Sequence, residues 1–176
     1  DITGMKTHRI SRMGIARTFQ VVKPIKGMTV LENVVAAAFS AADSRREAMK
    51  SALKTLEFCD LLHRKDLLAH NLPIGERKRL EIGRSLATRP RLLLLDEMSS
   101  GLNPGELENA IDLIGRIRET GVSIIIVEHV MKVIMTLSDR IHVLNLGRTL
   151  AEGTPGEVTG NPAVIKAYLG EANADG

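Results

Sequence analysis

The chain has 176 residues, of which 44% are hydrophobic and 26% charged, with a formal net charge of only +3. One globular domain is therefore expected, while the weak basic excess and the scarcity of aromatic residues argue against nucleic-acid binding. The single Cys59 excludes an internal disulfide, and no apolar run approaches the roughly 18 residues of a membrane span.

Residues 28–88 are expected to be mostly helical. A short helix over 8–13 stops near Gly14, and residues 15–20 form a strand-like piece that ends on Gln20. Thr29 is a suitable cap for a helix over 31–42, and a second helix is expected over 45–59.

The segment 72–82 reads as a loop that opens a helix. Pro73 is tolerated at a helix start, and Gly75 lets a ligand approach the backbone closely. The free amides of a helix N-terminus form an anion site. Arg77 and Lys78 oppose the helix dipole there, so they either meet a phosphate or simply face solvent.

Four consecutive leucines, residues 92–95, precede Asp96 and Glu97. Such a run is typical of a buried strand in a parallel sheet, although periodicity alone does not exclude a buried helix. Ligands of open α/β sheets bind at the carboxyl ends of strands. There Asp96 can hold Mg²⁺ and Glu97 can orient or deprotonate a water, unless both are ordinary surface acids.

Alternation of strand and helix continues to the end of the chain. Pro104 starts a helix to about Thr120, and a second buried strand over 122–127 leads to His129. If the sheet is parallel, His129 lies on the same edge as the two acids. The remaining predicted elements are a helix over 130–137, a hairpin of 141–146 and 149–152, helix starts at Thr154-Pro155 and Asn161-Pro162, and a frayed tail from Glu171.

Five of these features, in this order, resemble the Q-loop, signature, Walker B, D-loop and H-switch of ABC transporter ATPases. The residues that carry the resemblance are Gln20, Leu72-Pro-Ile-Gly75-Glu, Leu92 to Glu97, Ser100-Gly-Leu-Asn103 and His129. Further phrases are similar to the ATP-binding subunits of branched-chain amino-acid transporters. These phrases are residues 14–20, 28–34, 128–131, 151–155 and 161–170.

The resemblance implies a two-subunit sandwich, with ATP between the phosphate loop of one subunit and the signature of the other. Asp96 would hold Mg²⁺, Glu97 would polarise the attacking water, and His129 would bridge the γ-phosphate and the D-loop. Gln20 would sense Mg²⁺ and water and couple the site to the membrane subunits. The residues assigned to nucleotide binding are Gln20, Leu72, Pro73, Ile74, Gly75, Glu76, Ser100 and Asn103.

The signature departs from the usual Leu-Ser-Gly-Gly-Gln at Pro73, Ile74 and Glu76, and Met98 replaces the usual Pro after the catalytic Glu. Pro73 lacks the hydroxyl that would touch phosphate, but no departure removes the backbone amides. A larger departure is that no Gly in the chain is followed by Lys, so the 176 residues contain no Gly-x-x-x-x-Gly-Lys-Ser/Thr loop.

The predicted fold is therefore α/β: a P-loop NTPase-like ABC ATPase core with a largely parallel sheet, N-terminally truncated. We expect a single partial domain over 1–176, with a helical subdomain over 28–88 and the sheet core with the C-terminal part over 89–176. The absent first strand is expected beside the leucine run, and its loss should expose strand edges.

The implied function is an ATP-hydrolysing subunit that energises import of branched-chain amino acids. Its partners would be a second ABC ATPase subunit, transmembrane permease subunits and, indirectly, a substrate-binding protein, without nucleic acid. The chain would be cytoplasmic and peripheral on the inner face of the membrane. Two alternatives stay open: an ABC ATPase for lipid or lipopolysaccharide export, and a non-catalytic fragment that acts only through its signature face. DNA-repair relatives are disfavoured, because too few residues separate Gln20 from Gly75 for a long coiled coil.

Overall fold

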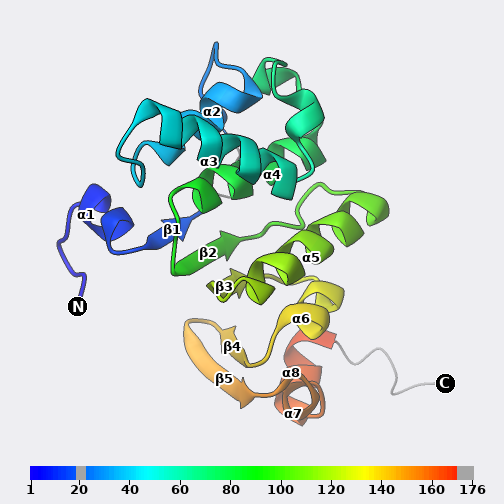
Figure 1. Ribbon diagram of the computed structural model, residues 1–176. Coiled ribbons are helices and arrows are strands. Elements are labelled where there is room, and N and C mark those ends of the chain that lie inside the picture. The colour runs from blue at the N-terminus through cyan, green and yellow to red at the C-terminus, as the bar shows by residue number, and fades with distance from the viewer. Residues whose placement is uncertain (19–22, 170–176) are drawn as a thin grey trace. The chain divides into compact units, whose positions relative to one another are not determined.

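The structure is a computed structural model that describes residues 1–18 and 23–169. The chain forms two compact units, Asp1–Glu128 and His129–Gly176. Figure 1 shows the helices and strands in chain order by colour.

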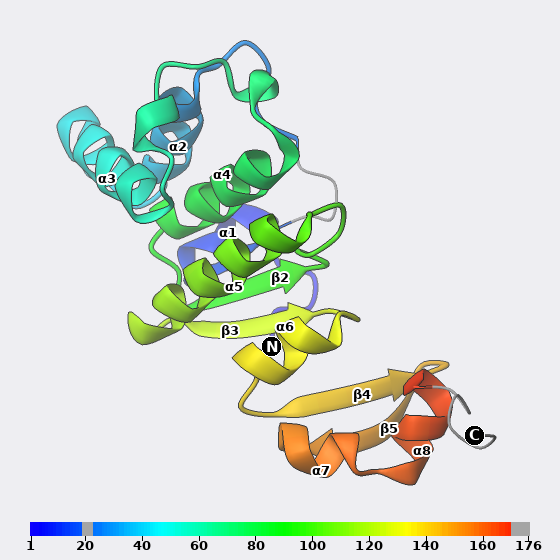
Figure 2. The ribbon, with the colours of Figure 1, turned by 90° about the vertical axis from the view of Figure 1, so that its right-hand side faces the viewer.

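A parallel sheet of three strands, in the order β1-β2-β3, lies in the first unit. Its strands are β1 (Ile15–Arg17), β2 (Leu92–Asp96) and β3 (Ser123–Val127). The four-leucine run is thus a strand rather than a helix, and Leu93 and Leu95 belong to the core. Figure 2 shows helix α5 (Pro104–Glu119) running alongside β2 and β3. The predicted α/β class with a parallel sheet is confirmed.

The leucine strand occupies the centre of the described sheet. Because β1 and β3 pair with β2 on its two sides, the place that was expected for a further strand beside β2 is already taken. Among the described strands of this sheet, the open edges belong to β1 and β3. On β3, the side chains of Ile125 and Val127 are 55% and 61% exposed. Strand β3 therefore combines an open edge with exposed apolar side chains.

Helices dominate the segment between β1 and β2, as the sequence predicts. They are α2 (Val30–Ala38), α3 (Arg45–Phe58) and α4 (Ile74–Ala87), with 3₁₀ turns η1 (Leu62–Arg64) and η2 (Ala69–Asn71), and α1 (Thr7–Arg12) precedes β1. Thr29 and Glu32 form a capping box at the start of α2. The small buried residues Ala48 and Ala52 allow α3 to pack closely against its neighbours.

Local side-chain chemistry shortens one predicted helix. Residues 31–42 were expected to be helical, but α2 ends at Ala38. The hydroxyl of Ser40 donates a hydrogen bond to the carbonyl of Ala37 at 2.8 Å, so this serine competes for a backbone acceptor near the helix end.

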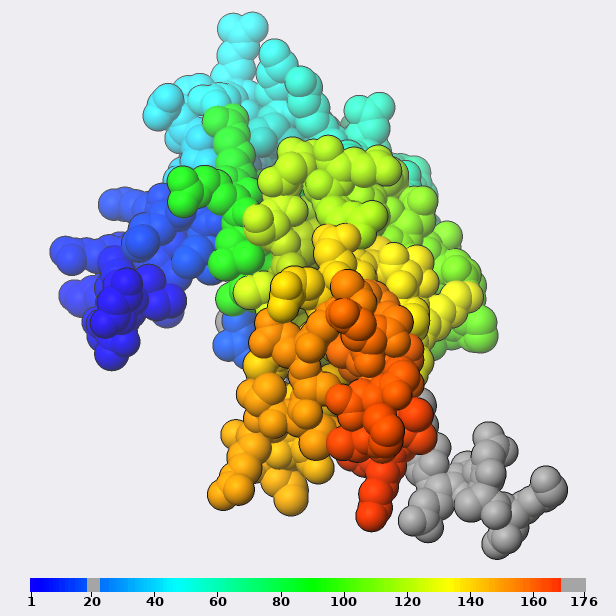
Figure 3. Space-filling model, turned by 90° about the horizontal axis from the view of Figure 1, so that it is seen from below, coloured from blue at the N-terminus to red at the C-terminus, as the bar shows by residue number. Residues whose placement is uncertain are grey.

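The second unit consists of short elements around a hairpin. These are α6 (Met131–Leu137), the antiparallel strands β4 (Ile141–Asn145) and β5 (Arg148–Gly153), α7 (Pro155–Thr159), α8 (Pro162–Val164) and a π-helical turn, η3 (Ile165–Leu169). Figure 3 shows the hairpin and the following helices packed side by side. The predicted hairpin and both Pro-initiated helices are present. The expected frayed tail from Glu171 lies outside the described residues.

No helix over residues 1–18 and 23–169 combines the length and the apolar character that a membrane crossing requires.

Candidate functional site

Asp96 and Glu97 stand at the carboxyl end of the central strand, as the sequence predicts. The last residue of β2, Asp96, pairs in register with Val127 at the end of β3. The next amide, that of Glu97, donates to the carbonyl of Val127 at 3.0 Å. The ends of both strands therefore hold the acidic pair at the sheet edge where ligands of α/β proteins bind.

Asp96 is also tied to β1. Arg17 donates through Nη2 to Asp96 Oδ2 at 3.0 Å, and the Asp96 amide donates to the hydroxyl of Thr18 at 3.3 Å. The guanidinium neutralises one carboxylate oxygen of Asp96 without burying the group, since the Asp96 side chain remains 31% exposed. This cross-strand pair joins residues that lie 79 positions apart and was not predicted.

Glu97 adopts a left-handed backbone, with φ of 42°. Left-handed conformations are unfavourable for a residue with a side chain and persist where the surroundings enforce them. The amide of Glu97 is fixed by Val127, as described above, and its carbonyl accepts from two further donors. These donors are the amide of Ser100 at 3.2 Å and the ammonium of Lys78 at 3.2 Å. The backbone of Glu97 is thus held at both of its polar groups.

The start of α4 presents free backbone amides. Pro73 is the N-cap residue and supplies no side-chain cap, and the first helical hydrogen bond runs from the Arg77 amide to the Pro73 carbonyl. The amides of Ile74, Gly75 and Glu76 have no acceptor among the described residues. An uncapped helix start of this kind has the geometry that binds anions.

Glu76 does not place an uncompensated charge at this helix start. Arg64, from η1, contacts its carboxylate, with Nε 3.2 Å from Oε2, and His63 Nε2 lies 4.0 Å from Oε1. The acid that replaces the usual signature Gln is therefore paired with a neighbouring cation, which reduces its repulsion of an anion at the helix start.

Lys78 faces neither solvent nor the free amides, contrary to both sequence-based interpretations. Its side chain is buried, and Nζ donates to the carbonyls of Glu97 and Met98 at 3.2 and 3.0 Å. Burial lowers the pKa of Lys78, while nearby carboxylates, Glu128 foremost, oppose that lowering. The sequence contained one signal for this residue, a lysine close to a predicted helix start, although in the structure Lys78 lies just beyond the first turn of α4.

The loop that follows Glu97 is held at its middle and at its end. The amide and the hydroxyl of Ser99 donate to the two carboxylate oxygens of Glu128, each at 2.8 Å. Asn103 and Glu106 form a capping box at the start of α5. Ser100 is exposed. The loop is therefore a fixed feature of the first unit.

The other predicted site residues fall in different settings. Leu72 is buried in the core of the first unit. Gln20 lies outside the described residues, and His129 is the first residue of the second unit, so their roles stay predictions. Over the described part of the chain, no group of three or more His, Cys, Asp or Glu side chains could hold a metal by itself.

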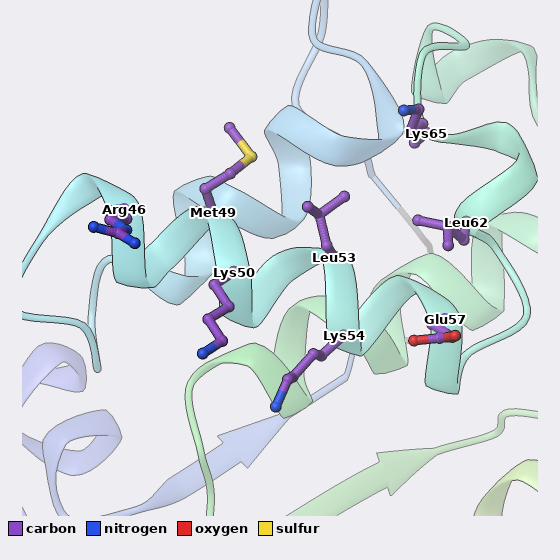
Figure 4. Close-up of a pocket in the computed structure, with 8 residues that line it drawn as sticks. All are labelled: Arg46, Met49, Lys50, Leu53, Lys54, Glu57, Leu62 and Lys65. Atoms are coloured by element: carbon purple, nitrogen blue, oxygen red, sulfur yellow. The ribbon is translucent and has the colours of Figure 1, made fainter.

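A shallow hollow of about 530 Å³ lies on the outer side of α3 and contains none of the predicted site residues. Figure 4 shows Met49 and Leu53 in it, with Lys50 and Lys54 on the same helix. Its lining also includes Arg46, Lys65 and Glu57. Because it lies away from the predicted site residues, we assign it no chemistry.

Comparison with known proteins identifies the family. Residues 1–100 match the family model described as ABC transporter, and residues 148–174 match that of the branched-chain amino acid ATP-binding cassette transporter. The chain is 42% identical to the Pseudomonas aeruginosa high-affinity branched-chain amino acid transport ATP-binding protein BraF, over 98% of this chain and 74% of the relative.

Solved structures support the same family assignment. The ADP conformation of MJ1267, an ATP-binding cassette of an ABC transporter, is 31% identical with a TM-score of 0.82, covering 97% of this chain and 74% of that one. The ATP-binding cassette MJ0796, in a dimeric structure bound to ADP and Pi, is 26% identical with a TM-score of 0.74, covering 86% and 68%. The family-model match over residues 1–100 and the 42% identity to BraF over 98% of the chain show that the protein belongs to the ABC transporter family of ATPases.

Proposed function

We propose that this chain is the ATP-binding and ATP-hydrolysing subunit of an importer of branched-chain amino acids. The observation that carries the proposal is the placement of Asp96 and Glu97 at the end of β2, in a loop that the signature helix α4 contacts through Lys78. The name of BraF and the C-terminal match over 148–174 support the transport class. No observation on the described residues favours export of lipid or lipopolysaccharide.

Asp96 would hold Mg²⁺. The ion usually takes one or two carboxylates together with substrate phosphates and water, so a single suitable acid is compatible with it. Oδ2 of Asp96 is engaged by Arg17, and Oδ1 has no partner among the described residues. When bound, Mg²⁺ would neutralise charge on the transferring phosphoryl group. Gln20 would be the second group near the ion.

Glu97 would polarise the attacking water, with its backbone fixed as described. The amides of Ile74, Gly75 and Glu76 would receive the γ-phosphate of a nucleotide bound to a partner subunit, and Leu72 and Pro73 would shape that approach. Such amides act by electrostatic stabilisation and need no side-chain hydroxyl, so Pro73 is compatible with the role.

Three further residues would complete the nucleotide site. His129 would bridge the γ-phosphate and the D-loop, in which Ser100 and Asn103 lie. In the structure the Asn103 side chain caps α5, so its contribution to a nucleotide would come through the loop conformation that the cap maintains.

Because the signature amides would act on a partner's nucleotide, the proposal requires a second ATPase subunit. The dimeric form of MJ0796 supports this arrangement. Permease subunits would hold the chain peripherally on the cytoplasmic face of the membrane, and a substrate-binding protein would deliver the amino acid. Within the chain, residues 28–88 would act as a helical subdomain and residues 89–176 as the sheet core and C-terminal part.

A domain exchange tests the function. The residues of BraF that match this chain are replaced by the chain itself, in a Pseudomonas aeruginosa strain without its own copy, and uptake of radiolabelled leucine is measured. We expect uptake that disappears with Glu97→Gln and persists with Glu57→Gln, the same change at an exposed position of α3.

Two outcomes would contradict the proposal. Absence of uptake from an exchanged protein that hydrolyses ATP would reject the amino-acid transport class. Uptake that is unaffected by Glu97→Gln would remove Glu97 from its assigned role.

A further inference from the structure

One buried lysine connects the signature helix to the loop that carries the catalytic acid. Lys78 lies one turn after the free amides of α4, and its ammonium is within hydrogen-bond distance of two successive carbonyls, those of Glu97 and Met98. A buried ammonium is costly unless polar partners surround it, so these carbonyls are its compensation.

Lys78 contacts a residue, Glu97, whose backbone conformation is energetically unfavourable. Glu97 has a left-handed backbone that its side chain disfavours, and its carbonyl receives both Lys78 Nζ and the Ser100 amide. Without the ammonium, the Met98 carbonyl would lose its only donor among the described residues. The Glu97 carbonyl would keep the Ser100 amide as a donor but lose the ammonium.

Helix α4 meets the same loop a second time, at its far end. A Cβ added to Gly75 would lie 2.6 Å from Oε1 of Glu106, so the helix start packs directly against the capping box of α5. A hollow of about 160 Å³ separates these two attachment points, and Gly75, Lys78, Met98, Leu102 and Glu106 are among its lining residues. The first turns of α4 therefore touch the loop where it begins and where it ends.

We propose that Lys78 is a positioning residue that fixes the backbone of Glu97 and Met98 and links the signature end of α4 to the catalytic carboxylate. In a sandwich dimer, α4 would act on the partner's nucleotide and Glu97 on the chain's own. Lys78 would then connect the two nucleotide sites within one chain. The part of this inference that concerns catalysis rests on the proposed function, whereas the structural part does not.

Amide hydrogen exchange of the folded 176-residue chain tests the structural part. The relevant amides are those of Ser99, Ser100 and Leu102, which donate within the loop or to Glu128. In Lys78→Met we expect them to exchange about tenfold faster or more, the effect of losing a charge-assisted hydrogen bond. Lys78→Arg, which keeps charged donors, should restore most of the protection. Lys54→Met makes the same change at an exposed position of α3 and should leave the exchange rates of these amides unchanged.

If Lys78→Met does not fold, Lys78→Gln replaces it, since its amide is one atom shorter than the ammonium and still polar. Parent exchange rates at these three amides, in a folded variant that lacks the lysine, would overturn the proposal.

The catalytic part of the proposal is tested on the BraF exchange protein, in which this chain replaces the matching residues of BraF. We expect Lys78→Met to lower kcat for ATP hydrolysis about tenfold or more with KM for ATP within about twofold, and Lys78→Arg to recover most of kcat. A role in folding alone would reduce the yield of active protein without recovery by Arg at equal active concentration. If the BraF exchange protein with the parent sequence does not hydrolyse ATP, the proposed function is rejected. Amide hydrogen exchange of the 176-residue chain then decides the role of Lys78. Unchanged kcat in Lys78→Met would reject the link to catalysis.

Discussion

Replacing Gly75 by Ala should reveal how closely the signature helix packs against the D-loop. The new Cβ would lie 2.6 Å from Oε1 and 2.8 Å from Cδ of Glu106. Glu106 cannot turn aside freely, because its other oxygen accepts the Asn103 amide at 3.0 Å. The substitution therefore has to break the capping box of α5.

Gly75→Ala has two opposing effects on the free energy of unfolding, and they are of similar size. Ala in place of Gly in a helix gains about 0.5–1 kcal/mol, and loss of a capping interaction costs about 1 kcal/mol. For Gly75→Ala we expect a change in the free energy of unfolding near zero or slightly destabilising. Gly115→Ala, in α5 with no atom within 4 Å of its Cβ, should give the undiminished gain of about 0.5–1 kcal/mol.

A double-mutant cycle isolates the clash. Glu106→Ala removes the obstructing carboxylate and should itself cost about 1 kcal/mol. In that background Gly75→Ala should stabilise by about 0.5–1 kcal/mol, so the coupling energy between the two sites is about 1 kcal/mol. Urea unfolding followed by circular dichroism measures all four proteins. Additive effects would refute the packing of Gly75 against Glu106.

Three other predictions follow from buried or exposed groups. Asn33→Ala should destabilise by about 1–3 kcal/mol in urea, because the buried amide donates to the carbonyls of Met28 and Thr29 and accepts from Ile25; a change below about 0.5 kcal/mol would contradict this. Burial raises the pKa of Cys59 from 9.0 to about 12, so above about pH 9 the unfolded chain loses the thiol proton and the folded chain keeps it. The free energy of unfolding should then fall, relative to Cys59→Ala, by about 1.4 kcal/mol per pH unit, and parallel curves for the two proteins would refute the shift. Ile125→Lys, on the open edge of β3, should slow aggregation, measured by light scattering, with little change in stability. Unchanged aggregation would show that the chains associate through another surface.

Local chemistry made much of the fold predictable. Thr29 was expected to cap a helix and Pro104 to start one, and in the structure both helices are present and each begins with a capping box. The leucine run before Asp96 identified the central strand, because an uninterrupted apolar run suits a strand covered on both faces. The positions of the acidic pair and of the signature helix followed from the same signals.

Contacts between distant residues were not predictable in this way. Arg17 reaches Asp96 because β1 and β2 are neighbours, a pairing that no local pattern specifies. The direction of Lys78 depends on the loop after β2, which only the folded chain brings next to α4. For the same reason, the sequence misplaced the open edges of the sheet, which among the described strands belong to β1 and β3 rather than to the leucine strand.

The central claim is that Glu97, held in its left-handed conformation at the end of β2, activates the water that hydrolyses ATP. The direct measurement compares ATP binding and single-turnover hydrolysis by the purified BraF exchange protein with those of its Glu97→Gln variant. The account predicts unchanged ATP binding and hydrolysis slower by about 10²–10⁴-fold, the usual effect of losing a general base. Hydrolysis by Glu97→Gln at the parent rate would contradict the account.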